Sequence, residues 1–326
     1  MTATVVLIPD CGGTVGLGHL ERLLALADAL RGAFSASVIV PEGEAMLARR
    51  VSDRGHHAIA LPGDAAERAA AAVDSLPADV VVLDGYVFSE EVQRGLRAHA
   101  RLVVVDDLGL PTDSDLAVNP SAGGELLHPE GAGAFLGGAD YALLSSGFVA
   151  ARTSVLARGQ PPRTALVSSG ATNLLDITAR FVVDVLAHDA TVEVLAVLGP
   201  QAVDAELPDD PRLEVLVAPS SLADLLARAT IFAGTAGTTA LQAACVGVPA
   251  VITAAVPNQV GPAAALVAAG CAVAAEPDDL ARECLSLLDD PSRRSRMADA
   301  GRKLVDGHGA CRVADEVRRL VRAPVA

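Results

Sequence analysis

Short unbroken apolar runs alternate with longer stretches of helical periodicity along most of the chain. Most of these runs are rich in valine, isoleucine and leucine, which is typical of parallel strands buried on both faces of a sheet. In the first half, the predicted strands cover residues 5–8, 36–40, 57–61, 80–83, 102–105 and 116–118. The predicted helices between them cover residues 20–30, 42–54, 65–76 and 89–98. This order predicts an α/β domain.

The second half repeats this order after a stretch with little pattern that ends in Gly-Gln-Pro-Pro-Arg. Its predicted strands are 164–168, 191–198, 213–217, 231–233 and 250–254, and its predicted helices are 176–187, 221–227, 238–245, 262–268, 277–288, 292–305 and 312–322. We therefore expect an N-terminal Rossmann-like domain over 1–145, a linker over 146–162 and a C-terminal Rossmann-like domain over 163–310. The last segment, 311–326, is expected to pack back on the first domain. Loops of the two domains would face each other across a cleft.

Composition restricts the partners of the chain. Its 326 residues carry a net charge of −15, which opposes binding to nucleic acid or to an anionic membrane. The five cysteines show neither Cys-x-x-Cys pairs nor zinc-ligand spacing, so we expect free thiols in the cytoplasm and no metal or other cofactor. The first apolar run has about six residues, whereas a membrane span needs roughly 20. The first domain shows no clear apolar or basic patch, which favours a soluble substrate.

The loop after the first predicted strand carries the most informative pattern. Gly16 and Gly18 flank Leu17, and His19 stands at the start of the helix that follows. Glycines let the backbone approach a ligand, and the first amides of a helix attract anions. An imidazole beside that anion can act as a base near neutral pH. The loop therefore predicts a phosphorylated ligand and a base-assisted reaction.

Polar residues also follow other strands of the first domain. Asp84 and Tyr86 come at the end of the fourth predicted strand, and Asp107 follows the fifth. Ligands of such sheets bind beyond the carboxyl ends of the strands, so Asp84 and Tyr86 are candidates to orient His19 or a substrate hydroxyl, and Asp107 is a candidate to bind the substrate. In the pair Asp106-Asp107, one acid is expected to cap a turn while the other faces the cleft. Arg22 either pairs with an acid such as Asp84 or contacts phosphate directly.

The second domain repeats the strand, loop and helix arrangement twice. Ser169, Gly170 and Thr172 form the first of its candidate nucleotide-binding loops. The second holds Gly237, Thr238 and Thr239, whose hydroxyls can cap the helix and also donate to phosphate oxygens. Gln242 lies one turn further along and faces either the cleft or solvent.

Several motifs in order give the chain a resemblance to a known family. They are Gly-x-Gly-His-x-x-Arg at 16–22, Asp84-Gly85-Tyr86, the segments 104–108, 136–144 and 237–242, Gly247-Val248-Pro249, and Asn258-Gln259. The set resembles the nucleotide-sugar hydrolases of pseudaminic acid biosynthesis, which are similar to GT-B glycosyltransferases. The resemblance covers about residues 4 to 310.

That resemblance implies a two-domain GT-B fold, no metal, and nucleotide binding mainly by the C-terminal domain. It implies that His19 is the base and that Gly16 and Gly18 shape the loop around the substrate. It also implies that the Gly237 loop holds the diphosphate, with Asn258 and Gln259 near the sugar or the phosphates.

The chain departs from the family pattern at charged positions. Asp10 matches the loop acid of the family, but Ile8 stands where an arginine is usual. Gln242 replaces the glutamate that binds the nucleotide ribose; it can still bond two hydroxyls, without a charge-assisted bond. Because sites built for specific polar groups discriminate strongly, these changes argue for a different substrate.

The sequence therefore supports several hypotheses. The first is hydrolysis of a nucleotide-activated sugar or related conjugate, in which His19 deprotonates water and either Asp84 or Asp10 orients it. The second is a GT-B glycosyltransferase, in which His19 deprotonates an acceptor hydroxyl. The third is an accessory protein that binds nucleotides without turnover. An NAD oxidoreductase is a weaker fourth, because Gly-x-Gly-x-x-Gly is absent.

Overall fold

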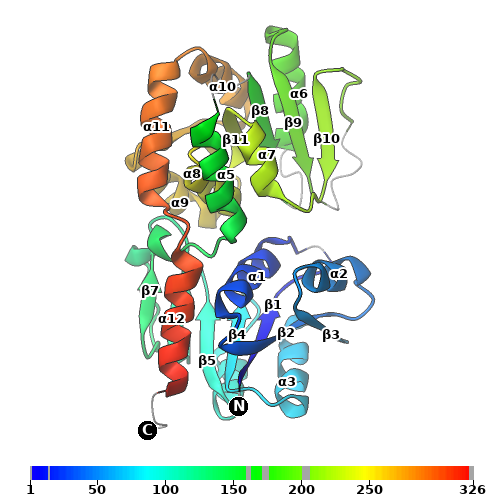
Figure 1. Cartoon of the computed structure of the whole chain (residues 1–326), viewed down its shortest axis with the longest axis vertical. Helices are drawn as coiled ribbons and strands as arrows, with labels where there is room; N and C mark the ends of the chain where they lie inside the picture. The colour runs from blue at the N-terminus through cyan, green and yellow to red at the C-terminus, as the bar shows by residue number, and fades with distance from the viewer. Residues whose placement is uncertain (1, 14, 159–162, 171–175, 200–205, 323–326) are drawn as a thin grey trace. The chain divides into compact units, whose positions relative to one another are not determined.

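The computed structural model describes residues 2–13, 15–158, 163–170, 176–199 and 206–322. The chain divides into two compact units (Figure 1). Unit 1 comprises Met1–Ser145 together with His308–Ala326, and unit 2 comprises Ser146–Gly307.

The core of unit 1 is a seven-stranded parallel sheet in the order β3-β2-β1-β4-β5-β6-β7. Its strands are β1 (Ala3–Pro9), β2 (Phe34–Pro41), β3 (His57–Leu61), β4 (Val80–Asp84), β5 (Arg101–Val105), β6 (Leu116–Asn119) and β7 (Phe135–Gly137). The chain starts in the middle of the sheet, winds outward through β3, and then returns to build the other side from β4. The strand order therefore reverses beside β1, which is where such sheets bind ligands.

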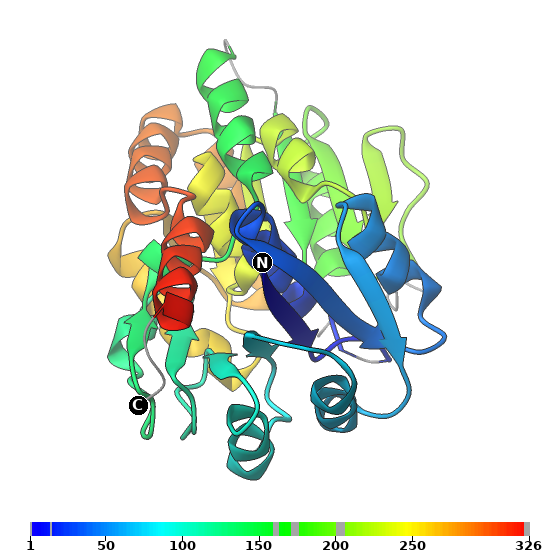
Figure 2. The same ribbon diagram turned by 60° about the horizontal axis from the view of Figure 1, so that its bottom comes forward.

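Helices cover both faces of this sheet (Figure 2). They are α1 (Gly18–Leu30), α2 (Ala45–Asp53), α3 (Ala65–Ser75), α4 (Glu90–Arg97) and α12 (Gly309–Arg322), with short 3-10 turns at Gly124–Leu126 and Ala139–Tyr141. Along β1, Val5 and Leu7 face the core under α1 and α12, whereas Val6 and Ile8 face the core under α3. Because both faces are buried, residues 5–8 of the strand are all apolar, as the unbroken run predicts.

Unit 2 holds a six-stranded parallel sheet in the order β10-β9-β8-β11-β12-β13. Its strands are β8 (Thr164–Ser168), β9 (Glu193–Leu198), β10 (Leu213–Val217), β11 (Ile231–Thr235), β12 (Ala250–Thr253) and β13 (Ala272–Ala274). Its helices are α5 (Ser146–Ala157), α6 (Ile177–His188), α7 (Leu222–Arg228), α8 (Thr238–Val246), α9 (Val260–Ala268), α10 (Leu280–Leu288) and α11 (Pro291–Leu304), with 3-10 turns at Pro257–Gln259 and Pro277–Asp279. The topology again reverses beside its first strand, β8.

The stretch that we expected to be a linker differs from the prediction. Most of it forms α5, which packs on α7 and α8 of unit 2. The Arg152 side chain fastens this helix, because its Nε donates to the carbonyl oxygen of Cys245 at 2.6 Å. The sequence did not predict this helix because its apolar and polar positions are weakly segregated; only Phe148 and Ala151 are buried. The short edge strands β7 and β13 were also not predicted.

The C-terminal helix α12 belongs to unit 1. It packs against α1, and Arg318 donates to the main-chain oxygen of Ala29 at 2.6 Å. Gly309 opens the helix where a Cβ would lie 2.3 Å from the carbonyl oxygen of Ala142, so only glycine allows this approach. Among the described residues, no helix combines the length and apolarity needed to cross a bilayer.

Candidate functional site

The carboxyl end of β4 lies beside the first turn of α1. Strands β1 and β4 are parallel neighbours with Pro9 opposite Asp84, and the Asp10 amide donates to the Asp84 carbonyl oxygen at 2.8 Å. The loop after β1 leads into α1, so this pairing places the Asp84 carboxylate next to His19 and Arg22. The cluster therefore sits where the strand order of the sheet reverses.

His19 and Asp84 form a short hydrogen bond, with Nδ1 2.6 Å from Oδ1. Asp84 also accepts from Arg22, whose Nε lies 2.9 Å from Oδ2 and whose Nη2 lies 2.5 Å from Oδ1. Nδ1 of His19 also lies 2.8 Å from Arg22 Nη2, a group that can only donate. The Asp84 contact therefore favours a proton on Nδ1, whereas the Arg22 contact favours a bare Nδ1. With the proton on Nδ1, the lone pair of Nε2 can take a proton from a ligand, which is the requirement for a general base.

Arg22 links two carboxylates within the cluster. Its Nη1 donates to Asp107 Oδ2 at 3.0 Å, and its side chain is only 6% exposed. Burial raises the pKa of Asp107, but the Arg22 charge and the Tyr86 hydroxyl outweigh burial and bring it below its ordinary value. Asp84 and Asp107 thus place two carboxylates around the single guanidinium of Arg22, next to His19. The contacts favour the pairing role of Arg22 over direct contact with phosphate.

Tyr86 forms one wall of the cluster. Its hydroxyl donates to Asp107, and its ring meets the His19 ring edge-on, with centroids 5.3 Å apart. Asp106 has a different role, because its carboxylate accepts from the amides of Leu108 and Leu110 at 3.1 and 2.7 Å. Asp106 therefore caps the turn, as we expected of one acid of this pair, whereas Asp107 belongs to the cluster around Arg22.

The other predicted loop residues of unit 1 lie close to the cluster with different roles. Of the two acids that we expected could orient His19, Asp84 is the one that bonds its ring, while Asp10 packs against Gly85. Gly16 lies in the loop, and Gly18 is the first residue of α1. A Cβ at Gly18 would meet no atom within 4 Å, so internal packing does not require glycine there. Room for a ligand is a remaining reason for it.

In unit 2, α8 begins directly after β11 with Thr238 and Thr239. Gly237 precedes the helix and provides no side-chain cap for its first amides. A Cβ at Gly237 would meet a single side chain, with Gln259 Nε2 3.7 Å away. The uncapped amides and two threonine hydroxyls suit an anion such as a diphosphate.

Gln242 lies one turn into α8, and its side chain is buried. It is 9% exposed, and its Oε1 has no hydrogen-bond partner among the residues that the structure describes. A buried acceptor without a donor is unusual and costs free energy unless a ligand or water supplies the donor. This orphan oxygen, one turn behind the uncapped amides, is available to a hydroxyl or N–H group.

The remaining predicted residues of unit 2 divide between loop closure and internal packing. Gln259 Oε1 accepts from the Ala255 amide at 2.9 Å, which closes the loop after β12, and Asn258 lies in the same 3-10 turn. Ser169 is buried and its hydroxyl bonds that of Thr178 at 3.0 Å, so this side chain is used to fasten α6. Gly170 has a φ of +90° and open space at its Cβ position. Thr172 lies outside the described residues.

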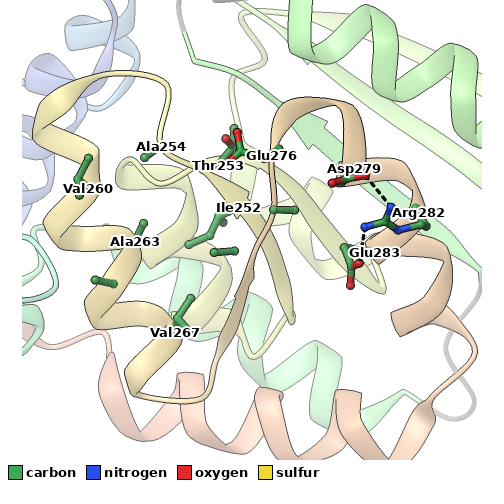
Figure 3. A pocket seen from close by; sticks show the side chains of 13 residues that line it. Ile252, Thr253, Ala254, Val260, Ala263, Val267, Glu276, Asp279, Arg282 and Glu283 are labelled. Carbon is green, nitrogen blue, oxygen red and sulfur yellow. Dashed lines mark hydrogen bonds and ion pairs between the residues drawn. The ribbon is translucent and has the colours of Figure 1, made fainter.

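A pocket of about 540 Å³ lies elsewhere in unit 2, between α9, α10 and the ends of β12 and β13 (Figure 3). Its rim holds three carboxylates, which are Glu276, Asp279 and Glu283, and one cation, Arg282. Arg282 pairs with Asp279 at 2.7 Å and with Glu283 at 3.1 Å. An excess of negative charge opposes binding of a diphosphate, so this pocket does not suit a nucleotide.

Few known proteins resemble this chain in sequence among those compared. No family model matches the chain. An uncharacterized protein of Methanocaldococcus jannaschii, MJ1062, is 22% identical over 209 residues, which is 60% of this chain. The match spans only 43% of that protein.

Solved structures are similar over nearly the whole chain. A UDP-glucosyltransferase from Polygonum tinctorium that glucosylates indoxyl has a TM-score of 0.72 at 14% identity, covering 99% of each chain. The glycotransferase of kitacinnamycin has a TM-score of 0.69 at 16% identity, covering 98% of this chain and 100% of the other. MurG of Acinetobacter baumannii has a TM-score of 0.64 at 16% identity, covering 97% and 99%. With its two parallel sheets, the chain therefore has the GT-B fold, as the sequence resemblance implied.

Proposed function

We propose that the chain is a glycosyltransferase that moves a sugar from a nucleoside-diphosphate sugar to a hydroxyl acceptor. The observation that carries this proposal is the 2.6 Å contact between His19 Nδ1 and Asp84, because a proton on Nδ1 directed at Asp84 would leave Nε2 as a base. Our first expectation from the sequence was hydrolysis. The names of two proteins with the same fold, a glycotransferase and a UDP-glucosyltransferase, support transfer instead.

In this proposal, His19 Nε2 takes the proton of the acceptor hydroxyl as the acceptor oxygen bonds to the anomeric carbon of the sugar. The bond from that carbon to the phosphate oxygen breaks, and its electron pair leaves with the nucleoside diphosphate. Asp84 stabilises the imidazolium that forms, and a positioned base of this kind contributes about 10²–10⁴-fold to the rate. The reaction requires that the two units bring His19 within reach of the anomeric carbon.

We assign the donor to unit 2. The amides and hydroxyls of Thr238 and Thr239, with Gly237 before them, would stabilise the charge that grows on the leaving diphosphate. The orphan Oε1 of Gln242 would accept a hydrogen bond from a ribose hydroxyl. Asn258 and Gln259 would lie near the sugar, while Gly16 and Gly18 leave room for the substrate beside His19.

The first experiment identifies the donor and the reaction. Melting temperature is measured with UDP, CMP, GDP and TDP, and sugars carrying the stabilising nucleotide are then incubated with and without hydroxyl acceptors. Release of nucleotide that depends on an acceptor is the expected result. Prompt release in buffer alone would identify a hydrolase, and a melting shift without turnover of any donor would identify a nucleotide-binding accessory protein.

The second experiment tests the base. His19→Asn should lower kcat at least 100-fold and leave the melting shift with nucleotide unchanged, because His19 and the donor residues belong to different units. His188→Asn is the matched control, since this exposed histidine only caps its own helix. Full activity of the His19 variant would remove the proposed mechanism.

A further inference from the structure

Large apolar side chains are exposed on the loops that follow three neighbouring strands of unit 1. Strands β4, β5 and β6 lie side by side, so their loops leave the same edge of the sheet. Between 36% and 82% of each of these side chains is exposed. We call the six residues the loop patch: Tyr86, Val87, Leu108, Leu110, Leu126 and Leu127. Single exposed apolar residues are common, but a contiguous set marks a binding surface.

The three loops are in contact with one another. Gly109 packs so closely on Leu127 that a Cβ at Gly109 would lie 3.0 Å from the Leu127 Cβ. The Thr112 amide donates to the Glu130 carbonyl oxygen at 2.8 Å, which ties the second loop to the third. The Tyr86 hydroxyl donates to Asp107, which ties the first loop to the second, so the loops that carry the patch are joined to one another.

The loop patch is also continuous with the candidate base. Tyr86 belongs to both, because its hydroxyl bonds Asp107 and its ring meets the His19 ring at a centroid distance of 5.3 Å. A molecule seated on the patch would reach the imidazole from which the proposed reaction starts. This continuity favours a substrate over an unrelated protein partner as the occupant.

The negative charge of these loops excludes anionic substrates. Residues 102–151 include seven Asp and Glu residues but no Arg or Lys. The arginines of the adjacent α4, Arg94 and Arg97, are paired with Asp113. A carboxylate, a phosphate or an anionic membrane would therefore meet no counter-charge in these loops, and carboxylates such as Glu125 would repel it.

We infer that the acceptor is an apolar hydroxyl compound without an anionic group, and that its apolar part binds the loop patch. This inference rests on the proposed function and specifies its acceptor. The sequence showed no clear apolar patch in this domain, because the six residues lie in three loops that only the fold brings together.

Binding is tested without turnover, on the full chain. The probe is 2-naphthol, followed by its fluorescence, since the protein contains no tryptophan. We expect saturable binding, and at least tenfold weaker binding of the anionic analogue 6-hydroxynaphthalene-2-sulfonate. The variant Leu110→Asn/Leu126→Asn should bind 2-naphthol at least tenfold more weakly, and Val87→Asn provides a second variant should the first fail to fold. Leu156→Asn is the control, because this residue is 61% exposed on α5 of unit 2.

Each outcome separates this inference from the proposed function. Equal binding of both probes, or unchanged binding by the patch variants, overturns the inference even if sugar transfer is found. Selective binding of 2-naphthol without transfer from any donor removes the proposed function but leaves the apolar site. Flotation with phosphatidylserine vesicles that is lost in the patch variants would assign the patch to a membrane and also overturn the inference.

Discussion

The sharpest prediction concerns Asp84→Asn, which keeps the side-chain shape but removes its charge. The Asp84 side chain is fully buried and accepts two hydrogen bonds from Arg22 and one from His19. Asparagine offers one oxygen acceptor and an amide that must face either the guanidinium or Nδ1 of the imidazole. The substitution therefore leaves Arg22 short of negative charge and disturbs the tautomer of His19.

The loss of stability and the loss of activity can both be estimated from these contacts. Removing one partner of a buried ion pair costs about 3–5 kcal/mol, and we expect about 3 kcal/mol because Asp107 still holds Arg22. A domain of this size melts about 2–4 °C lower for each kcal/mol, so the melting temperature should fall by about 6–12 °C. If the new amide faces Nδ1, the proton moves to Nε2 and the base is lost. The comparable substitution in a serine-protease triad lowers kcat by about 10⁴.

The assay combines urea unfolding, kcat and ¹⁵N NMR of the imidazoles, with the His19 signals assigned from His19→Asn. In the unaltered protein the Nδ1 of His19 should carry the proton, and in Asp84→Asn it should not. Asp107→Asn is the matched control, because it leaves the bond between His19 and Asp84 in place. It should cost about 1 kcal/mol of stability and less than tenfold in kcat.

Asp84 has neither of these roles if the free energy of unfolding of Asp84→Asn lies within about 1 kcal/mol of that of the unaltered protein while Nδ1 of His19 stays protonated. The buried charge would then not hold Arg22, and another group would set the tautomer. A variant that is strongly destabilised but keeps its kcat would separate the two roles and remove only the catalytic one.

Other predictions test packing and electrostatics away from the site. Gly234→Ala should lower the free energy of unfolding by about 2 kcal/mol or more, because the new Cβ would lie 1.9 Å from a carbonyl oxygen of β8. Gly261→Ala should raise the free energy of unfolding by about 0.5–1 kcal/mol, because the new Cβ would meet open space in α9; urea titration of both variants measures these changes. Burial raises the pKa of Cys11 to about 12, so iodoacetamide at pH 8 should label the exposed Cys311 first in peptide mapping; fast labelling of Cys11 would contradict its burial. Hydrogen bonds from Thr191 lower the pKa of Asp189 to about 2, so the ionised carboxylate stabilises the fold fully above about pH 4, and this stabilisation is lost as the pH falls toward 2. Asp189→Asn should therefore lose about 1 kcal/mol less stability in acid than the unaltered protein, as measured by melting at several pH values; an unchanged acid profile would contradict this.

The sequence by itself determined the parts of this protein that depend on local pattern. The apolar runs located β1 to β6 and β8 to β12, because the strands of a parallel sheet are rich in valine, isoleucine and leucine, even in the outer strands β3 and β10, which are partly exposed. The glycine loop placed His19 at the start of α1, because the break between strand and helix is written in adjacent residues. The ordered motifs indicated the GT-B fold, which the structural likeness confirms.

Only the tertiary structure decided which residues meet. Asp84 rather than Asp10 orients His19, and Arg22 is held by carboxylates that lie 62 and 85 positions away in the chain. The edge strands β7 and β13 have three residues each, too few to show a period. The orphan oxygen of Gln242 and the loop patch depend on burial and exposure in the folded chain. Contacts between distant segments set both quantities, and no local pattern of residues records them.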